Sequence, residues 1–170
     1  GWNNSFDGLV NITAGISDPS YNYVTVDGRK HYGILVTIPA TGGDGVVAAQ
    51  SGSIADVNFY DIEILGPYCT VSKPCTYSAN GFDIISASGT VANMVISDSY
   101  IHGVSEAFRA KSCNNVVVEH TTIADTADDG TSHGDVIYSY PSTNVSFGYD
   151  NIYNTLQHGI RYIMRYLRLL

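Results

Sequence analysis

The stretch Asn93-Met94-Val95-Ile96-Ser97-Asp98-Ser99-Tyr100-Ile101 contains the pattern that decides the fold. The same pattern recurs in segments that begin at Val57, Met94, Val116 and Val145. Two places further on, the aligned residues are Phe59, Ile96, Val118 and Phe147, and seven places on they are Ile64, Ile101, Ile123 and Ile152. Apolar residues in all twelve aligned places predict an internal repeat.

A corner residue precedes each of these segments. The four residues are Asp56, Asn93, Asn115 and Asn144. Asn and Asp tolerate the left-handed backbone of a tight corner, and stacked Asn amides can form a hydrogen-bonded ladder. The two apolar residues that follow are spaced two apart, so they face the same side of a strand.

Successive repeats begin 37, 22 and 29 residues apart. These steps are too short, and too rich in Gly and β-branched residues, for strand-helix-strand units. The pattern therefore predicts an all-β parallel β-helix of about six coils, each rising by roughly 4.8 Å, in one domain of 170 residues. Looser repeats cover residues 23–28, 33–38 and 46–49, and a β-sandwich is the competing architecture.

The two ends of the chain depart from the repeat. Residues 1–20 are expected to be irregular or to form an N-terminal cap, and residues 158–170 to form the last partial coil or a cap. Arg161, Arg165 and Arg168 recur at helical spacing, which predicts a short amphipathic helix over the open end of the stack. A truncated or non-native terminus is the alternative for this tail.

Composition excludes several classes of protein. Only 14% of residues are charged and 44% are apolar, which argues against a coiled coil and against disorder. Residues 1–156 contain only five of the eight Lys and Arg but all sixteen Asp and Glu. Nucleic-acid binding needs basic side chains that neutralise phosphates, so no nucleic-acid partner is expected. No apolar run is long enough to predict a transmembrane segment.

Cys69 and Cys75 bracket a short loop that contains a proline. A disulfide between them would imply an oxidising, extracytoplasmic setting, and two unpaired thiols are the alternative. Cys113 is expected to be a small buried apolar residue.

Unequal repeat lengths predict where a ligand would bind. The insertions at 66–80 and 125–133 both follow the aligned isoleucine, so they should leave the solenoid at the same corner. Between these two tall loops lies the shortest coil, and the groove between them would have a floor of four polar residues: His102, Glu106, Arg109 and Lys111.

The chemistry of this floor is acidic with a few cations. If Phe108 and Ala110 face inward, Arg109 and Lys111 face outward side by side, and a neighbouring cation lowers the pKa of an amine that must act as a base. Two surface cations that offset acidic neighbours are the alternative. The loop carboxylates of Asp125, Asp128, Asp129 and Asp135 could bind Ca²⁺, or could form a solvated turn.

Over about residues 20–160 the repeat resembles the pectate-lyase-like right-handed parallel β-helix superfamily. That resemblance implies secreted enzymes that cleave acidic polysaccharides, together with some non-catalytic adhesins. The segment Glu106-Ala107-Phe108-Arg109-Ala110-Lys111-Ser112-Cys113-Asn114-Asn115 is similar to the Glu…Lys-Ser…Asn stretch of alginate and chondroitin lyases with this fold. It implies that Lys111 is the base and that Glu106 helps to hold calcium. The Arg of the Arg-His-Gly that follows in those lyases is absent before His133 and Gly134.

A second similarity is to polygalacturonase-type hydrolases. Asn80-Gly81-Phe82-Asp83 looks like their first acidic motif and Ser132-His133-Gly134 like their Gly-His-Gly. Ser105-Glu106 stands where those enzymes carry Asp-Asp. Inverting hydrolysis needs two carboxyl groups placed across the bond, so hydrolysis ranks below elimination.

The function predicted from sequence is that of a secreted polysaccharide lyase-like enzyme cleaving a uronate-containing polymer by β-elimination. Its expected residues are the base Lys111 or Arg109, the acid His133, the calcium ligands Glu106, Asp128 and Asp129, and the substrate-binding residues His102, Asp83 and Asp135. One alternative is a non-catalytic module that binds glycans along a stacked Tyr face, as an adhesin does, or self-assembles through its open ends. The other is a polygalacturonase-type hydrolase.

Overall fold

The computed structural model describes most of the chain and shows an all-β protein. The described residues are 10–12, 16–18, 22–29, 32–48, 53–68, 72–73, 77–85, 89–127, 135–155, 160–162 and 167–169. Their strands form three sheets in which every strand pairing is parallel. No described residue is helical, and the described chain therefore holds no helix that could span a membrane.

Each sheet takes its strands from the whole length of the chain. Sheet A contains, in spatial order, β1 (Val10–Ile12), β4 (Ile34–Thr37), β8 (Ile62–Leu65), β11 (Tyr100–His102), β14 (Thr122–Thr126) and β17 (Asn151–Thr155). Sheet B contains β2 (Ile16–Asp18), β5 (Gly43–Ala48), β9 (Ala79–Ile85), β12 (Glu106–Lys111), β15 (Ile137–Tyr140) and β18 (Ile160–Tyr162). Sheet C contains β3 (Thr25–Asp27), β7 (Asn58–Tyr60), β10 (Val91–Ser97), β13 (Cys113–Glu119), β16 (Thr143–Gly148) and β19 (Leu167–Leu169), and β6 (Ile54–Ala55) also pairs with β10.

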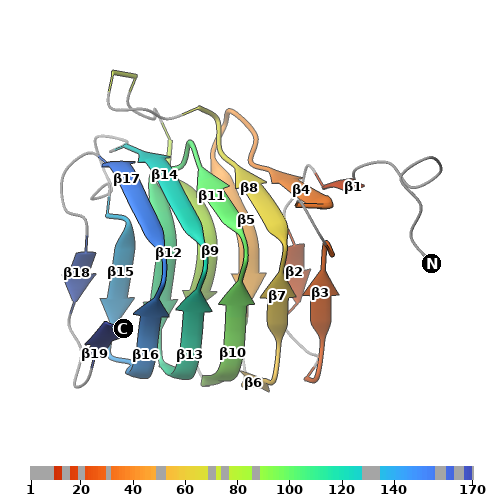
Figure 1. The fold of residues 1–170 in the computed structure, drawn as a ribbon, viewed down its shortest axis with the longest axis vertical. Coiled ribbons are helices and arrows are strands. Elements are labelled where there is room, and N and C mark those ends of the chain that lie inside the picture. Colours follow the sequence, from red (N-terminus) through yellow and green to blue (C-terminus); the bar gives the residue numbers. More distant parts are fainter. Residues whose placement is uncertain are drawn as a thin grey trace.

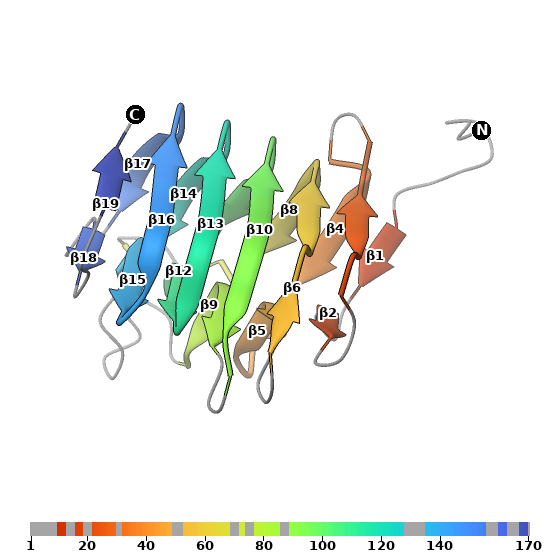
Figure 2. The same cartoon turned by 90° about the horizontal axis from the view of Figure 1, so that it is seen from below.

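The chain visits the sheets in a constant rotation from A to B to C. Each return to a sheet places the new strand beside the one laid down a round earlier, so neighbours in a sheet are non-consecutive in sequence. Figure 1 and Figure 2 show the strands advancing from the red N-terminal end to the blue C-terminal end. The described parts of residues 1–20 join this pattern, because β1 pairs with β4 and β2 pairs with β5.

Strand register confirms the predicted columns, apart from Val57, which lies between β6 and β7. Ile101 on β11 is paired with Ile64 on one side and Ile123 on the other, and Ile123 is paired with Ile152. In sheet C the paired residues include Met94, Val116 and Val145 in one column and Phe59, Ile96, Val118 and Phe147 in another. The first three isoleucines are fully buried, whereas Ile152 is 38% exposed because it lies on the last described strand of sheet A.

The four predicted corner residues all have left-handed backbones. Their φ angles are 60° at Asp56, 51° at Asn93, 58° at Asn115 and 51° at Asn144. The side-chain Nδ2 of Asn115 donates a hydrogen bond of 2.8 Å to Oδ1 of Asn93. This bond is one rung of the expected Asn ladder. The corner residues lie beside one another because the strands that flank them are paired in register.

Aromatic rings fill the interior shared by sheets B and C. Phe59 contacts Phe82 edge-on with a centroid distance of 5.4 Å, and Phe108 contacts Phe147 in the same way at 5.3 Å. Phe82 and Phe108, on neighbouring strands of sheet B, are 6.5 Å apart and fully buried. Edge-to-face packing adds to the stabilisation that these rings gain from burial, so the phenylalanines help to hold the two sheets together.

The C-terminal helix predicted from the arginine spacing is wrong where the structure describes the tail. Residues 160–162 and 167–169 are strands β18 and β19, which pair with β15 and β16. The open edges of β15 and β16 offer rows of unpaired backbone donors and acceptors, and these extend the sheets when the chain pairs with them. The Leu167-Arg168-Leu169 alternation also suits a strand.

Burial explains the state of two further groups. Cys113 is buried as predicted, and burial raises the pKa of its thiol to about 12. Cys69 and Cys75 lie outside the described residues, so the disulfide stays a prediction.

Asp150, just before β17, accepts a 2.8 Å hydrogen bond from the backbone N–H of Thr121. Burial is the main cause that raises the pKa of Asp150 from 3.8 to about 6.

The raised pKa of Asp150 predicts a pH-dependent stability. In the unfolded chain the carboxyl of Asp150 has its ordinary pKa of 3.8, and folding raises that pKa to about 6. The protonated carboxyl therefore favours the folded state. This contribution to the free energy of unfolding is complete below pH 3.8 and is lost as the pH rises through about 6. Asp150→Asn keeps an acceptor oxygen and removes the charge. We expect the variant to be about 1 kcal/mol more stable than the native protein at neutral pH, after allowance for solvent screening.

Urea unfolding of both proteins on either side of this pH window measures the effect. The advantage of Asp150→Asn should vanish at the acidic end of the window, where the native carboxyl is protonated in both states. A stability difference that stays constant with pH contradicts the assignment.

Candidate functional site

Strand β12 presents the predicted cations on the outer face of sheet B. Phe108 and Ala110 are fully buried, whereas Arg109 is partly exposed and Lys111 is exposed. This alternation is the one predicted for a period-two strand, so Arg109 and Lys111 do share the outward face. Glu106 begins the same strand and is 5% exposed.

Arg109 is held by a carboxylate on the neighbouring strand. Its Nε donates a hydrogen bond of 2.8 Å to Oδ1 of Asp83, and its Nη2 donates one of 2.7 Å to Oδ2, so the ion pair is bidentate. The two residues are directly paired across β12 and β9. Hydrogen bonding to Asp83 is the main cause that raises the pKa of Arg109, which burial partly opposes. A guanidinium in this state is a fixed cation, and this favours Lys111 over Arg109 as the base.

The third guanidinium nitrogen of Arg109 faces Glu106. Nη1 of Arg109 lies 3.9 Å from Oε2 of Glu106, three residues earlier on the strand. The side chain of Asp83 is 7% exposed and that of Glu106 is 6% exposed. Arg109 is therefore a cation that balances two buried carboxylates, and its own side chain stays 28% exposed to solvent.

Asp44 is a member of this cluster that the sequence pattern did not reveal. Nδ2 of Asn80 donates a 2.7 Å hydrogen bond to Oδ1 of Asp44, and the two residues are paired across β9 and β5. Burial is the main cause that raises the pKa of Asp44, and the nearby Asp83 carboxylate adds to it. The sequence signal that could have revealed Asp44 is the loose repeat match in the strand Gly43–Ala48. That match is too weak to predict the register of the strand.

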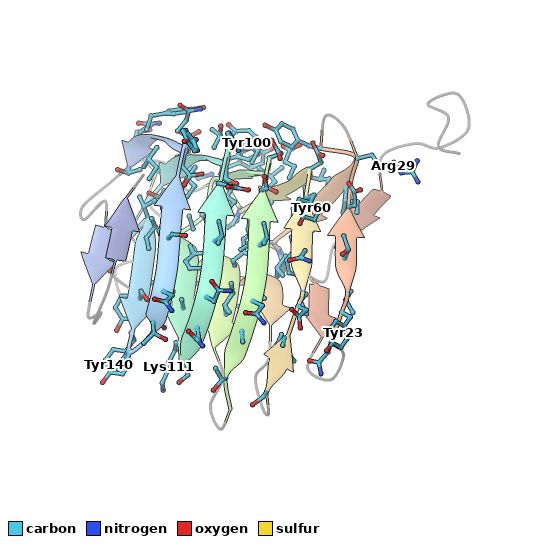
Figure 3. The ribbon with its side chains drawn as sticks, turned by 60° about the horizontal axis from the view of Figure 1, so that its bottom comes forward. Tyr23, Arg29, Tyr60, Tyr100, Lys111 and Tyr140 are labelled. Carbon is cyan, nitrogen blue, oxygen red and sulfur yellow. The ribbon has the colours of Figure 1, made fainter. Side chains whose placement is uncertain are left out.

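Lys111 lies at the far end of β12 from Glu106. Its Nζ is 5.9 Å from the ring centroid of Tyr140, which is paired with it on β15. This distance is within the range of a cation–π interaction. Figure 3 shows Lys111 and Tyr140 side by side on one border of the sheets and Tyr100 on the opposite border. The amine is held over an aromatic ring but stays open to solvent.

Both predicted insertions leave the fold at the corner between sheets A and B. One connects β8 to β9 and the other connects β14 to β15, whereas β11 and β12 are joined by residues 103–105 alone. Gly66 packs on Gly103 at this corner so closely that a Cβ on Gly66 would lie 2.0 Å from the Gly103 carbonyl oxygen. Much of the two loops, residues 69–71, 74–76 and 128–134, lies outside the described residues, so the groove stays a prediction.

His102 lies on a different sheet from the cations. It is the last residue of β11 in sheet A, where its Nε2 is 2.8 Å from Oε1 of Glu63 and its ring stacks on Tyr100 at 4.0 Å. The sequence pattern predicts His102 in the turn that follows Ile101, on the floor of the groove, whereas the structure has it at the end of β11. The pattern could not show that the His102 side chain is engaged with Glu63 and Tyr100 on sheet A.

The predicted calcium ligands are only partly described. Glu106 is buried, and Asp135 is fully buried two residues before Ile137, which is paired with Phe108. Asp128, Asp129 and His133 lie outside the described residues. Within the described ranges, no group of three or more His, Cys, Asp or Glu side chains is arranged to hold a metal ion. Calcium therefore stays a prediction that depends on the loop 128–134.

Comparisons with known proteins place no relative beside this chain. No protein-family model, no curated protein and no solved structure matches it.

Proposed function

We propose that the three sheets form one right-handed parallel β-helix domain of about six coils. The constant rotation of the chain from sheet A to B to C supports this, as do the single apolar core built from all three sheets and the left-handed corner residues. The right hand follows the strong preference of parallel crossover connections.

On this solenoid, we propose a secreted carbohydrate-active enzyme that cleaves a uronate-containing polysaccharide by β-elimination at the outer face of sheet B. The observation that carries the proposal is the placement of Arg109 and Lys111 next to one another on this face, with Arg109 fixed by Asp83. An anionic polymer approaching this acidic chain needs a local positive charge, and the exposed amine of Lys111 supplies one beside the guanidinium that Asp83 holds in place.

In the proposed reaction, Arg109 orients the sugar carboxylate and Lys111 acts as the base. Lys111 removes the proton from the carbon that bears the carboxylate, a double bond forms, and the glycosidic oxygen leaves with a proton from an acid. His133 is the proposed acid. Asp83 is a positioning residue, because it acts through the guanidinium of Arg109. The structure assigns neither Asp135 nor His102 a contact with the sugar chain, because Asp135 is fully buried and His102 is engaged with Glu63 and Tyr100 on sheet A.

Calcium would neutralise the sugar carboxylate if Glu106 and the carboxylates of Asp128 and Asp129 held it together. Glu106 fits such a role in chemistry, but it already faces Arg109 in the described cluster. The steps assigned to Arg109 and Lys111 do not depend on the ion.

Hydrolysis is the second candidate reaction, and the carboxylates of Asp44 and Asp83 favour it. Burial raises the pKa of Asp44, whereas Asp83 is paired with the guanidinium of Arg109. Neighbouring carboxyl groups in unlike environments are what a general acid and a general base require. The two candidate reactions share a site and differ in their products.

Incubation of the protein with polygalacturonate and with alginate, with and without calcium, tests the proposal. We expect new reducing ends together with ultraviolet absorbance from the unsaturated product. Lys111→Ala should lower the initial rate about 100-fold or more, since a positioned base contributes at least that much. Arg29→Ala, which removes an exposed cation beside β3, is the matched control and should keep the native rate.

The products separate the alternatives. New reducing ends without ultraviolet absorbance would replace elimination by hydrolysis. Native turnover in Lys111→Ala would overturn the assignment of the base. A protein that binds these polymers without cleaving them would be a non-catalytic glycan-binding or self-assembling β-helix.

A further inference from the structure

The outer face of sheet A carries a cluster of aromatic side chains that the proposed reaction does not use. Tyr100 and His102, two residues apart on β11, stack with an interplanar angle of 5°. Tyr32, just before β4, lies 5.9 Å from Tyr100 between ring centroids. Tyr153 on β17 is hydrogen-bonded to Tyr100. We call Tyr32, Tyr100, His102 and Tyr153 the aromatic stripe.

The stripe crosses the sheet along the direction in which strands stack. From β4 to β17 it passes over five strands, a span of about 20 Å, which accommodates several sugar rings. Strand pairing places Ala124 between His102 and Tyr153. Ala124 does not belong to the apolar core, yet it is fully buried. Neighbouring side chains on the outer face of the sheet therefore cover it. Tyr153 is 52% exposed and offers a ring to solvent.

Carboxylates surround the stripe. Glu63 is in register with Tyr100 and accepts the hydrogen bond of His102, and Asp125 lies close to Tyr100. Burial is the main cause that raises the pKa of Tyr100 to about 12, and the negative charges of Glu63 and Asp125 add to it. The charged side chains that act on Tyr32 in the same way are Asp61, Glu63 and Asp98.

The outward residues described on β4, β8, β11, β14 and β17 include no Lys or Arg. A polyanion is repelled from such a surface, because like charges raise the free energy of approach. An uncharged sugar chain meets no such penalty. Its C–H faces pack on tyrosine rings, and its hydroxyls donate charge-assisted hydrogen bonds to carboxylates.

We propose that the aromatic stripe of sheet A binds an uncharged polysaccharide. This site goes beyond the proposed function, since it lies on another sheet and uses neither Arg109 nor Lys111. Figure 3 shows Tyr100 on the border opposite Lys111 and Tyr140. The two faces would let the protein hold an uncharged polymer while it acts on an acidic one.

Affinity electrophoresis of the full chain in gels containing xylan, glucomannan or hydroxyethylcellulose tests the site. We expect at least one of these uncharged polymers to retard the native protein. Tyr153→Ala and Tyr100→Ala should each weaken retention at least tenfold, whereas Tyr100→Phe should keep most of it because the ring remains. Tyr23→Ala is the matched control, since Tyr23 is 83% exposed and lies at the start of sheet C.

Circular dichroism of each variant checks that loss of binding is not loss of fold. Retention that is unchanged in the Tyr153→Ala variant would overturn the proposal, and so would native protein that migrates freely in every uncharged polymer. Retention by chitosan oligomers alone would replace an uncharged ligand by a cationic one. Lys111→Ala should bind these polymers as the native protein does, which keeps this test separate from that of the lyase reaction.

Discussion

Phe108→Ala is expected to lower the free energy of unfolding by about 4 kcal/mol, the range found when a buried phenylalanine is truncated. Phe108 is fully buried on β12 and contacts Phe147 edge-on at 5.3 Å and Phe82 at 6.5 Å. Removal of its ring leaves a cavity between sheets B and C, and a closely packed interior relaxes only partly around such a cavity. Urea unfolding followed by far-ultraviolet circular dichroism measures the loss.

Tyr23→Ala serves as the control for Phe108→Ala because it also removes an aromatic ring. Tyr23 is 83% exposed, so its loss should change stability by less than about 0.5 kcal/mol. A Phe108→Ala variant that loses no more than this control would show that the ring is not part of a packed core.

Arg109→Gln is expected to cost about 3 kcal/mol of stability, because it leaves the Asp83 carboxylate buried without its cation. The Asp83 side chain is 7% exposed and receives two hydrogen bonds from Arg109. Glu106, 3.9 Å from the same guanidinium, loses its neighbouring positive charge as well. Thermal or urea unfolding measures the loss, and Arg29→Gln, at an exposed position, provides the control.

Asp83→Asn in the Arg109→Gln background separates lost charge balance from lost packing. The double variant should be more stable than Arg109→Gln alone, because the uncompensated carboxylate has been replaced by a neutral amide. If the double variant is no more stable than the single one, the interaction between Asp83 and Arg109 is not what stabilises this face of sheet B.

The repeat could be found in the sequence because parallel pairing brings residues at the same place in successive repeats together. Ile64, Ile101 and Ile123 could be aligned from spacing alone, and strand pairing brings them together in that order. The same reasoning failed for the tail. The arginine spacing at 161, 165 and 168 suggested a helix, but β18 and β19 extend the sheets because the preceding strands leave open edges there.

Only part of the candidate site could be predicted from the sequence. Alternation along β12 was enough to predict that Arg109 and Lys111 share the outward face. The pairing of Arg109 with Asp83 and the presence of Asp44 depend on the register of three strands separated by loops of unequal length. His102 lies close to Glu106 in sequence, yet it belongs to sheet A.

By itself, the amino-acid sequence determined which side chains point inward and where the chain turns, because period-two alternation and left-handed Asn corners are local properties. Only the tertiary structure decided which outward side chains meet. The meeting of Tyr32, Tyr100 and Tyr153 across sheet A, and of Asp44, Asp83 and Arg109 across sheet B, depends on strand register. Register is set by hydrogen bonding and packing between neighbouring strands rather than by any local sequence signal.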